Sequence, residues 1–281
     1  MEADRALPTG QRRWKRAVGV GILSLLVGAF ATWSWQPQAT VVHGSIIIDG
    51  EPREYRLVAP SVDKRAEGFI PSVFPSHPTP AKPNHNIPVI FALHGALDTV
   101  DEMAAYTELD RLAIEKGFLL VYLQGRMLNW PPFIPPENPG IYEPDAKFFN
   151  AMCDFVVREY DVDPQRIYLL GVSQGGAAAN ALTAMCSDQI AATVVGCGWL
   201  PDPLGDSPLQ TANKCPMLFL VGDRDRQVPP AMVRKGYEAF ERAGHPVEFR
   251  MIEGFGHGWP RRENERVWEF LEGKRLEKGS E

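Results

Sequence analysis

The chain has 281 residues, of which 44% are hydrophobic and 23% are charged. This is enough apolar material for one sizeable core, and it excludes a disordered chain and a protein with many membrane spans. Beyond residues 1–35, 24 Lys and Arg stand against 33 Asp and Glu. The net negative charge of residues 36–281 argues against a nucleic-acid partner, because phosphate binding needs a basic face.

The first predicted element is an N-terminal export segment. The basic stretch Arg12–Arg16 precedes an uncharged apolar run from Ala17 to Trp35, which is the layout of a secretory signal. The run is nearly long enough to span a bilayer and ends in aromatic residues, which suit a membrane interface. Cleavage and retention as a membrane tether through residues 17–35 therefore both stay open. In either case we expect residues 36–281 to form one domain outside the cytoplasm, secreted or anchored.

Strands and helices alternate along the remaining chain. Asp49-Gly50 predicts a hairpin between two strands, and residues 61–88 form a Pro-rich loop. Continuous apolar runs such as Pro88–Leu93 suit strands that are buried on both faces of a parallel sheet. The alternation predicts an α/β fold, with a mostly parallel sheet and helices on both faces. The predicted strands are Thr40–Asp49, Arg53–Pro60, Pro88–Leu93, Phe118–Leu123, Arg166–Gly171, Ile190–Val195, Met217–Val221 and Val247–Ile252, and the predicted helices are Val100–Lys116, Ala146–Tyr160, Gln174–Met185, Ala231–Ala243 and Glu263–Leu276.

A possible nucleophile lies in the middle of this pattern. Gly171-Val172-Ser173-Gln174-Gly175 matches G-x-S-x-G, and glycines on both sides relieve the crowding of a sharp turn. The match alone is weak, since an ordinary Gly-rich turn produces it too. Here an apolar strand precedes it and a small-residue helix follows it, as a nucleophile elbow requires. Ser173 is therefore the predicted nucleophile.

The partners of such a serine follow it in the order acid, then histidine. His257 lies in a loop directly after a predicted strand, whereas His245 precedes that strand and so lies at the wrong end of the sheet. Asp223 and Asp225 both follow the strand before that one. We favour Asp225 as the acid, because Asp223 next to a glycine is suited to stabilise the turn.

Two backbone N–H groups are needed to bind the negative oxygen that forms during acyl transfer. The residue after the nucleophile, Gln174, is the first predicted donor. The second is Ala96, in the loop that follows Pro88–Leu93. We expect His94 to hold that loop through local hydrogen bonds.

With these residues in place, the chain resembles the polyhydroxybutyrate depolymerase and feruloyl esterase group of α/β-hydrolases, from about residue 41 to about residue 272. The resemblance implies an α/β-hydrolase fold and a triad completed by the aspartate of D-x-x-V-P and the histidine of G-H-x-W-P. It also implies that Trp130, similar to the family's W-N-W segment, walls the substrate cleft. Two departures are Ala96 and Met127-Leu128, where the family often has cysteine. The segments that carry the resemblance are Leu93-His94-Gly95-Ala96, Gly171–Gly176, Asp225–Pro229 and Gly256–Pro260.

The chain contains four cysteines, which permit three disulfide pairings in an exported protein or four free thiols. None lies in a C-x-x-C pair, so neither a zinc site nor a thioredoxin-like site is predicted. The cysteines are Cys153, Cys186, Cys197 and Cys215.

Together these features predict a serine carboxylic-ester hydrolase that works through an acyl-enzyme, with no cofactor and no metal. The expected partner is a small-molecule or polymer ester: a feruloyl ester, a polyhydroxyalkanoate or a short-acyl ester. Trp130 and Trp259 are the candidate substrate-binding residues. Two alternatives stay open, a serine peptidase of the same fold and a non-catalytic binding protein built on it.

Overall fold

The structure is a computed structural model that describes residues 39–60, 87–132, 138, 140–202, 209, 211 and 213–276. The predicted N-terminal segment lies outside the described residues, and so does the loop predicted at 61–88, apart from its last two residues. Among the helices that the structure does describe, none is long and apolar enough to cross a membrane.

Eight strands form one sheet in the described part of the chain, in the order β1-β2-β4-β3-β5-β6-β7-β8. The pairs β1/β2 and β2/β4 are antiparallel and every other pair is parallel. The predicted α/β fold with a mostly parallel sheet is therefore confirmed. The strands are β1 (Ala39–Ile48), β2 (Glu51–Pro60), β3 (Ile87–Leu93), β4 (Leu119–Leu123), β5 (Val162–Val172), β6 (Ala192–Gly196), β7 (Met217–Gly222) and β8 (Val247–Ile252).

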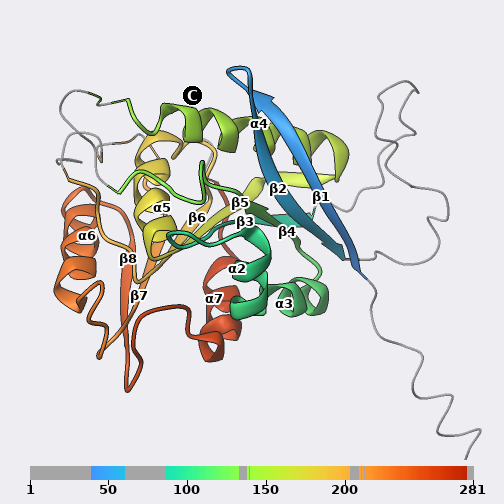
Figure 1. The fold of residues 1–281 in the computed structure, drawn as a ribbon. Helices are drawn as coiled ribbons and strands as arrows, with labels where there is room; N and C mark the ends of the chain where they lie inside the picture. The colour runs from blue at the N-terminus through green and yellow to red at the C-terminus, as the bar shows by residue number, and fades with distance from the viewer. Residues whose placement is uncertain are drawn as a thin grey trace, which may run out of the picture. The chain divides into compact units, whose positions relative to one another are not determined.

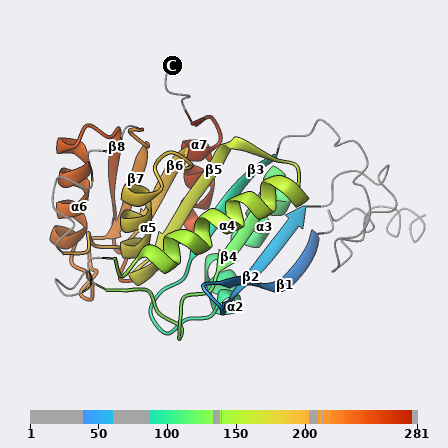
Figure 2. The same ribbon diagram turned by 90° about the horizontal axis from the view of Figure 1, so that it is seen from above.

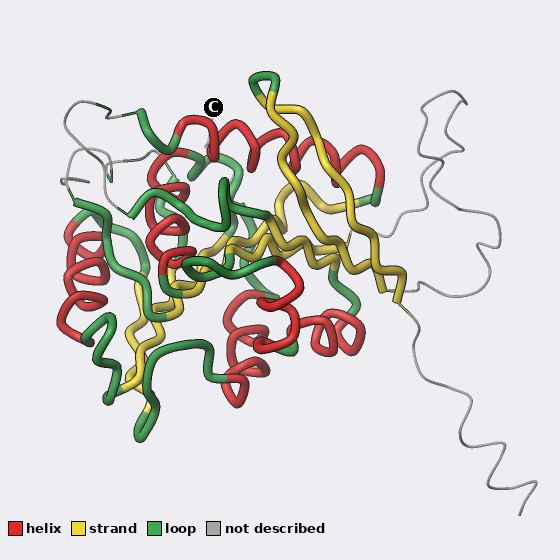
Figure 3. Tube along the Cα trace, in the orientation of Figure 1, coloured by secondary structure: helices red, strands yellow, loops and turns green. Residues whose placement is uncertain are grey.

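Helices cover both faces of the sheet (Figures 1 and 3). In Figure 2, α4, α5 and α6 lie in front of the sheet, and α7 and α3 lie behind it. Alternate residues of one strand pack into hydrophobic clusters on opposite faces of the sheet. On β3, Phe91 packs in the cluster with α4 and α5, and Ile90 packs in the cluster with α2, α3 and α7. This explains the continuous apolar runs. The helices are α2 (Val100–Thr107), α3 (Leu109–Lys116), α4 (Glu143–Glu159), α5 (Gln174–Met185), α6 (Pro230–Arg242) and α7 (Asn264–Leu271), the last preceded by a 3₁₀ turn at Arg261–Glu263.

The hairpin and α5 are formed as predicted, but two helices differ. The predicted helix Val100–Lys116 is broken at Glu108, which adopts the left-handed conformation with φ 56° and separates α2 from α3. The predicted helix Glu263–Leu276 ends at Leu271. Its last residues turn back to the sheet, where the Leu276 N–H donates to Gln165 O at 2.9 Å. A contact with a distant residue accompanies the break as well, since Arg261 Nη1 donates to Glu108 Oε1 at 2.5 Å, and a local pattern contains neither contact.

Candidate active site

Ser173 lies at the sharp turn between β5 and α5. Its backbone has φ 55° and ψ −118°, a region that side-chain-bearing residues rarely adopt. Its N–H donates to Gly196 O on the neighbouring strand at 2.8 Å. A Cβ on Gly171 would collide with the backbone of Gly175, and one on Gly175 would collide with Leu93 O. The glycines of G-x-S-x-G are therefore required by backbone packing around this turn.

Three side chains predicted from the sequence meet at this turn. His257 Nε2 lies 2.9 Å from Ser173 Oγ. On the other side of the ring, His257 Nδ1 lies 2.8 Å from Asp225 Oδ2. Ser173 follows β5, Asp225 follows β7 and His257 follows β8, so parallel strands bring all three to one edge of the sheet.

The two aspartates of the loop after β7 differ in burial and in their hydrogen bonds. The Asp225 side chain is fully buried, and its Oδ1 accepts the N–H groups of Gln227 and Val228 at 3.0 and 2.9 Å. Asp223 is exposed. The turn-stabilising contacts that we expected of Asp223 are thus made by Asp225, whose second oxygen holds His257. His245 is buried away from the triad, with Nδ1 3.0 Å from Cys215 O.

The two predicted oxyanion donors flank the serine. Gln174 is the first residue of α5, so its N–H has no partner inside the helix. The loop that carries Ala96 passes close to Ser173, since a Cβ on Gly95 would lie 3.7 Å from Ser173 Cβ. None of the backbone hydrogen bonds of the described loops and turns uses the Ala96 N–H, and Ala96 is exposed. Among the hydrogen bonds of the described residues, neither of these N–H groups is used.

His94 holds this loop, as expected. Its Nδ1 lies 2.7 Å from Gly95 O, and its Nε2 accepts the Gly125 N–H at 2.9 Å. Burial lowers the pKa of His94, which keeps the ring neutral. A residue that the sequence reasoning missed, Gln124, places its Nε2 2.7 Å from His94 Nε2. The signal available in the sequence was its position directly after a buried strand.

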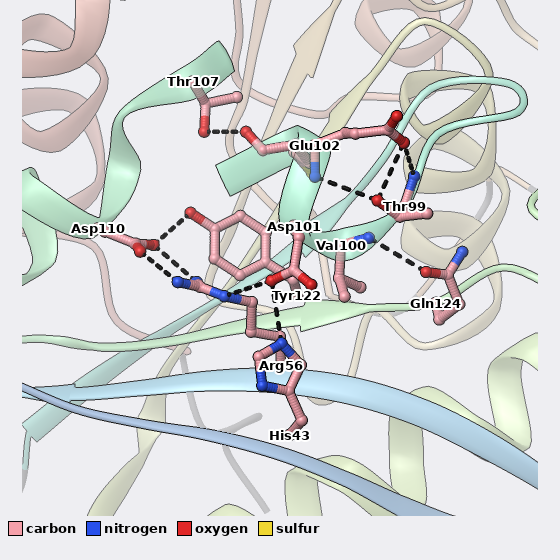
Figure 4. A network of polar contacts seen from close by, with 11 residues as sticks. His43, Arg56, Thr99, Val100, Asp101, Glu102, Thr107, Asp110, Tyr122 and Gln124 are labelled. Carbon is pink, nitrogen blue, oxygen red and sulfur yellow. Dashed lines mark hydrogen bonds and ion pairs between the residues drawn. The ribbon is translucent and has the colours of Figure 1, made fainter. Parts of the chain in front are cut away.

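Gln124 also connects the loop to α2. Its Oε1 accepts the Val100 N–H at 3.1 Å (Figure 4). Next to it, Thr99 and Glu102 form a capping box that starts α2. The start of α2 and the end of β4 thus fix both ends of the loop that carries Ala96.

The two tryptophans predicted to bind substrate are almost fully buried. Trp130 is 2% exposed and Trp259 is 5% exposed. The indole of Trp130 donates to His94 O at 3.0 Å, and its backbone N–H donates to Gln174 Oε1 at 3.1 Å. The indole of Trp259 donates to Asn264 Oδ1 at 2.7 Å. Little of either ring is therefore open to substrate, and each indole N–H is bonded to another part of the protein.

All four cysteines are buried free thiols. Sγ of Cys197 lies within 4.8 Å of the ligand atoms of Asp225 and His257, a spacing that would suit a metal ion. The donor set does not fit one. Cys197 Sγ donates to Gly258 O at 3.5 Å, and burial raises its pKa to about 12. Asp225 and His257 are already bonded to each other.

A groove of about 1030 Å³ runs along the loop after β4, and none of Ser173, Asp225 and His257 lines it. Its walls come from the hairpin of β1 and β2, from residues 124–131 after β4, and from the start of α4. Met127 and Leu128 border it. They belong to the loop that also contributes Trp130, which contacts Gln174.

The sheet order and the contacts among Ser173, His257 and Asp225 can now be set beside known proteins. The comparisons that follow point to esterases. Residues 146–274 match a family model described as Phospholipase/Carboxylesterase. A solved ferulic acid esterase superposes with a TM-score of 0.58 at 19% identity, covering 84% of this chain and 97% of that one. The chain has the fold of the α/β-hydrolases. Among proteins of this fold, the chain resembles esterases.

Two relatives illustrate the resemblance. A protein of Nocardia uniformis subsp. tsuyamanensis named as an esterase, NocK, is 30% identical over 190 residues, which cover 66% of this chain and 49% of that protein. Feruloyl esterase B of Neurospora crassa is 31% identical over 98 residues, covering 34% of each chain. This chain thus spans half or less of the length of these two relatives. The likeness to polyhydroxybutyrate depolymerases stays a prediction from the motifs.

Proposed function

We propose that this protein is a serine carboxylic-ester hydrolase with Ser173 as nucleophile, His257 as general base and Asp225 as the residue that orients His257. The observation that carries the proposal is the continuous pair of contacts from Ser173 Oγ to His257 Nε2 and from His257 Nδ1 to Asp225 Oδ2, at 2.9 and 2.8 Å. An unbroken serine–histidine–carboxylate series activates a hydroxyl for attack on a carbonyl.

The proposed reaction has two steps. His257 Nε2 removes the proton of Ser173 as Oγ attacks the ester carbonyl, and the N–H groups of Ala96 and Gln174 hold the resulting oxyanion. His257 then donates that proton to the leaving alcohol, which produces the acyl-enzyme. Water attacks the acyl-enzyme by the same route and releases the acid. Asp225 accepts from Nδ1 throughout and stabilises the imidazolium.

The substrate class rests on the relatives. Their names include esterase and feruloyl esterase, which supports a small ester or an ester on a polymer, with feruloyl, polyhydroxyalkanoate and short-acyl esters as candidates. A location outside the cytoplasm, by secretion or by a tether through residues 17–35, remains part of the proposal. It rests on the basic stretch followed by an apolar run in the sequence.

Hydrolysis of p-nitrophenyl acetate and butyrate by the purified full-length protein tests the proposal. We expect Ser173→Ala to lower kcat/KM by at least about 10³-fold, with unchanged circular dichroism. Ser45→Ala, an exposed serine on β1, is the matched control and keeps the wild-type rate. A wild type that ignores esters and cleaves peptide amides would replace the esterase with a peptidase. No hydrolysis of either would favour a binding protein.

A further inference from the structure

Three exposed apolar side chains next to the oxyanion loop have backbones that such residues rarely adopt. Leu97, Met127 and Leu128 have φ values of 62°, 48° and 62°. They are 71%, 92% and 39% exposed. Bulky side chains with positive φ are conformational outliers, and exposure removes the burial that normally favours an apolar residue. We call these three residues the apolar rim.

Met127 and Leu128 form the centre of a tight turn. The Asn129 N–H donates to Arg126 O at 3.0 Å, and both central residues have positive φ, as in a type I′ turn. Such turns strongly prefer Asn-Gly or a similar pair. Backbone strain of this kind gathers at ligand sites, where the surrounding structure holds it. The choice of Met-Leu therefore points to a use for the two side chains.

The rim is attached to the catalytic machinery. The Leu97 N–H donates to Leu128 O at 2.8 Å, which joins its two parts. Leu97 directly follows Ala96, the proposed oxyanion donor. Two residues after Leu128, the Trp130 N–H donates to Gln174 Oε1 at 3.1 Å. The rim is thus continuous with both sides of the proposed oxyanion site.

The order of strands decides which part of an ester faces the rim. Leu97 follows β3 and Leu128 follows β4, on one side of β5 and Ser173; His257 follows β8, on the other side. His257 must face the leaving alcohol, because it donates a proton to that oxygen. The oxyanion and the acyl group take the remaining positions on the carbonyl carbon, and we place both on the side of β3 and β4, where the oxyanion donor Ala96 precedes Leu97. Met127 and Leu128 also line the groove of about 1030 Å³, whose other walls include charged side chains such as Glu51 and Glu143, so an apolar chain is expected to stay at the rim.

We propose that Leu97, Met127 and Leu128 bind the apolar acyl chain of the ester and make the protein selective for acyl groups longer than acetyl. This inference rests on the proposed esterase function and deepens it. Contact between an aliphatic chain and these side chains removes apolar surface of both from water, which is favourable and grows with each methylene. Acetate is too short to reach beyond the oxyanion loop and gains nothing from the rim.

The test compares p-nitrophenyl acetate with p-nitrophenyl octanoate. The variant Met127→Asn with Leu128→Gly restores the residue pair that the turn prefers, so we expect its melting temperature to be no lower than that of the wild type. We expect its octanoate-to-acetate ratio of kcat/KM to fall about tenfold. Leu97→Asn, a second variant at a left-handed position that asparagine tolerates, lowers the same ratio. Met232→Gln, at an exposed methionine on α6, is the matched control and leaves the ratio unchanged.

The outcomes distinguish a failure of the acyl-chain assignment from a failure of the proposed esterase function. An active wild type whose ratio is unchanged in both rim variants overturns the inference and leaves the esterase intact. A wild type without activity on any ester overturns both. If the rim instead joins two copies of the chain or binds a lipid surface, the rim variants lose dimerisation or binding to phosphatidylcholine vesicles while the ester ratio stays constant. That result also overturns the acyl-chain assignment.

Discussion

The N–H of Gly125 donates to His94 Nε2 at 2.9 Å, which joins the loops after β4 and β3. A backbone N–H can only donate, so Nε2 carries no proton and the neutral ring has its proton on Nδ1. Nδ1 then donates to Gly95 O at 2.7 Å. A single neutral histidine therefore holds the backbone just before the proposed oxyanion donor Ala96 against the loop after β4.

The neutrality of His94 predicts a pH dependence of stability. Burial lowers the pKa of His94 in the folded protein, whereas a histidine in the unfolded chain has a pKa of about 6.5. As pH falls below that value, the unfolded chain takes up a proton that the folded chain resists, so the free energy of unfolding decreases. We expect His94→Gln, whose amide oxygen can accept the Gly125 N–H, to lose less stability than the wild type between pH 7.5 and 5.5. Urea unfolding at the two pH values measures this, and parallel losses would contradict it.

The loop after β7 offers two aspartates for a direct comparison. Asp225 lies 2.8 Å from His257 Nδ1, whereas Asp223 is exposed. We expect Asp225→Asn to lower kcat on p-nitrophenyl butyrate by about 10³- to 10⁴-fold, because the amide no longer holds the imidazole in its working tautomer. Asp223→Asn is the matched control and stays within about twofold of the wild type. A larger loss at Asp223 would reverse the assignment.

The close backbone contact behind the serine predicts the effect of one methyl group. A Cβ on Gly175 would collide with Leu93 O and His94 O, both backbone atoms that have little freedom to move. We expect Gly175→Ala to lower the free energy of unfolding by about 1–3 kcal/mol and to lower esterase activity, because the loop with Ala96 must shift. Gly273→Ala, where a Cβ meets nothing within 4 Å, provides the control. Equal melting temperatures for the two variants would contradict this account.

A buried ion pair connects the hairpin to α4. Arg53 Nη2 lies 2.9 Å from Asp145 Oδ1, and both side chains are nearly inaccessible. Asp145→Ala leaves a buried guanidinium without its partner, so we expect a loss of about 3–5 kcal/mol in the free energy of unfolding. The exposed pair of Lys147 and Asp49 joins the same two elements at 2.7 Å. Asp49→Ala should therefore cost far less, and chemical denaturation of both variants checks the difference.

Much of this architecture could be predicted from local patterns. Buried parallel strands have continuous apolar runs, and the elbow has its glycines next to Ser173, because sheet burial and tight turns each restrict residue type directly. The break at Glu108 and the early end of α7 could not be predicted. Each lies at a tertiary contact that helix propensity does not include: Arg261 Nη1 donates to Glu108 Oε1, and the Leu276 N–H donates to Gln165 O.

The sequence by itself determined the fold class, the place of Ser173 and the candidate loops for its partners, because strand–helix alternation and turn glycines are encoded over short spans of chain. Only the tertiary structure decided which aspartate contacts His257. It also decided that Trp130 and Trp259 are buried and that Leu97, Met127 and Leu128 stand exposed beside the oxyanion loop. Those facts depend on strand order and on which side chains fill the space between strands and helices. The contacts that decide them are made between residues that are far apart in the chain.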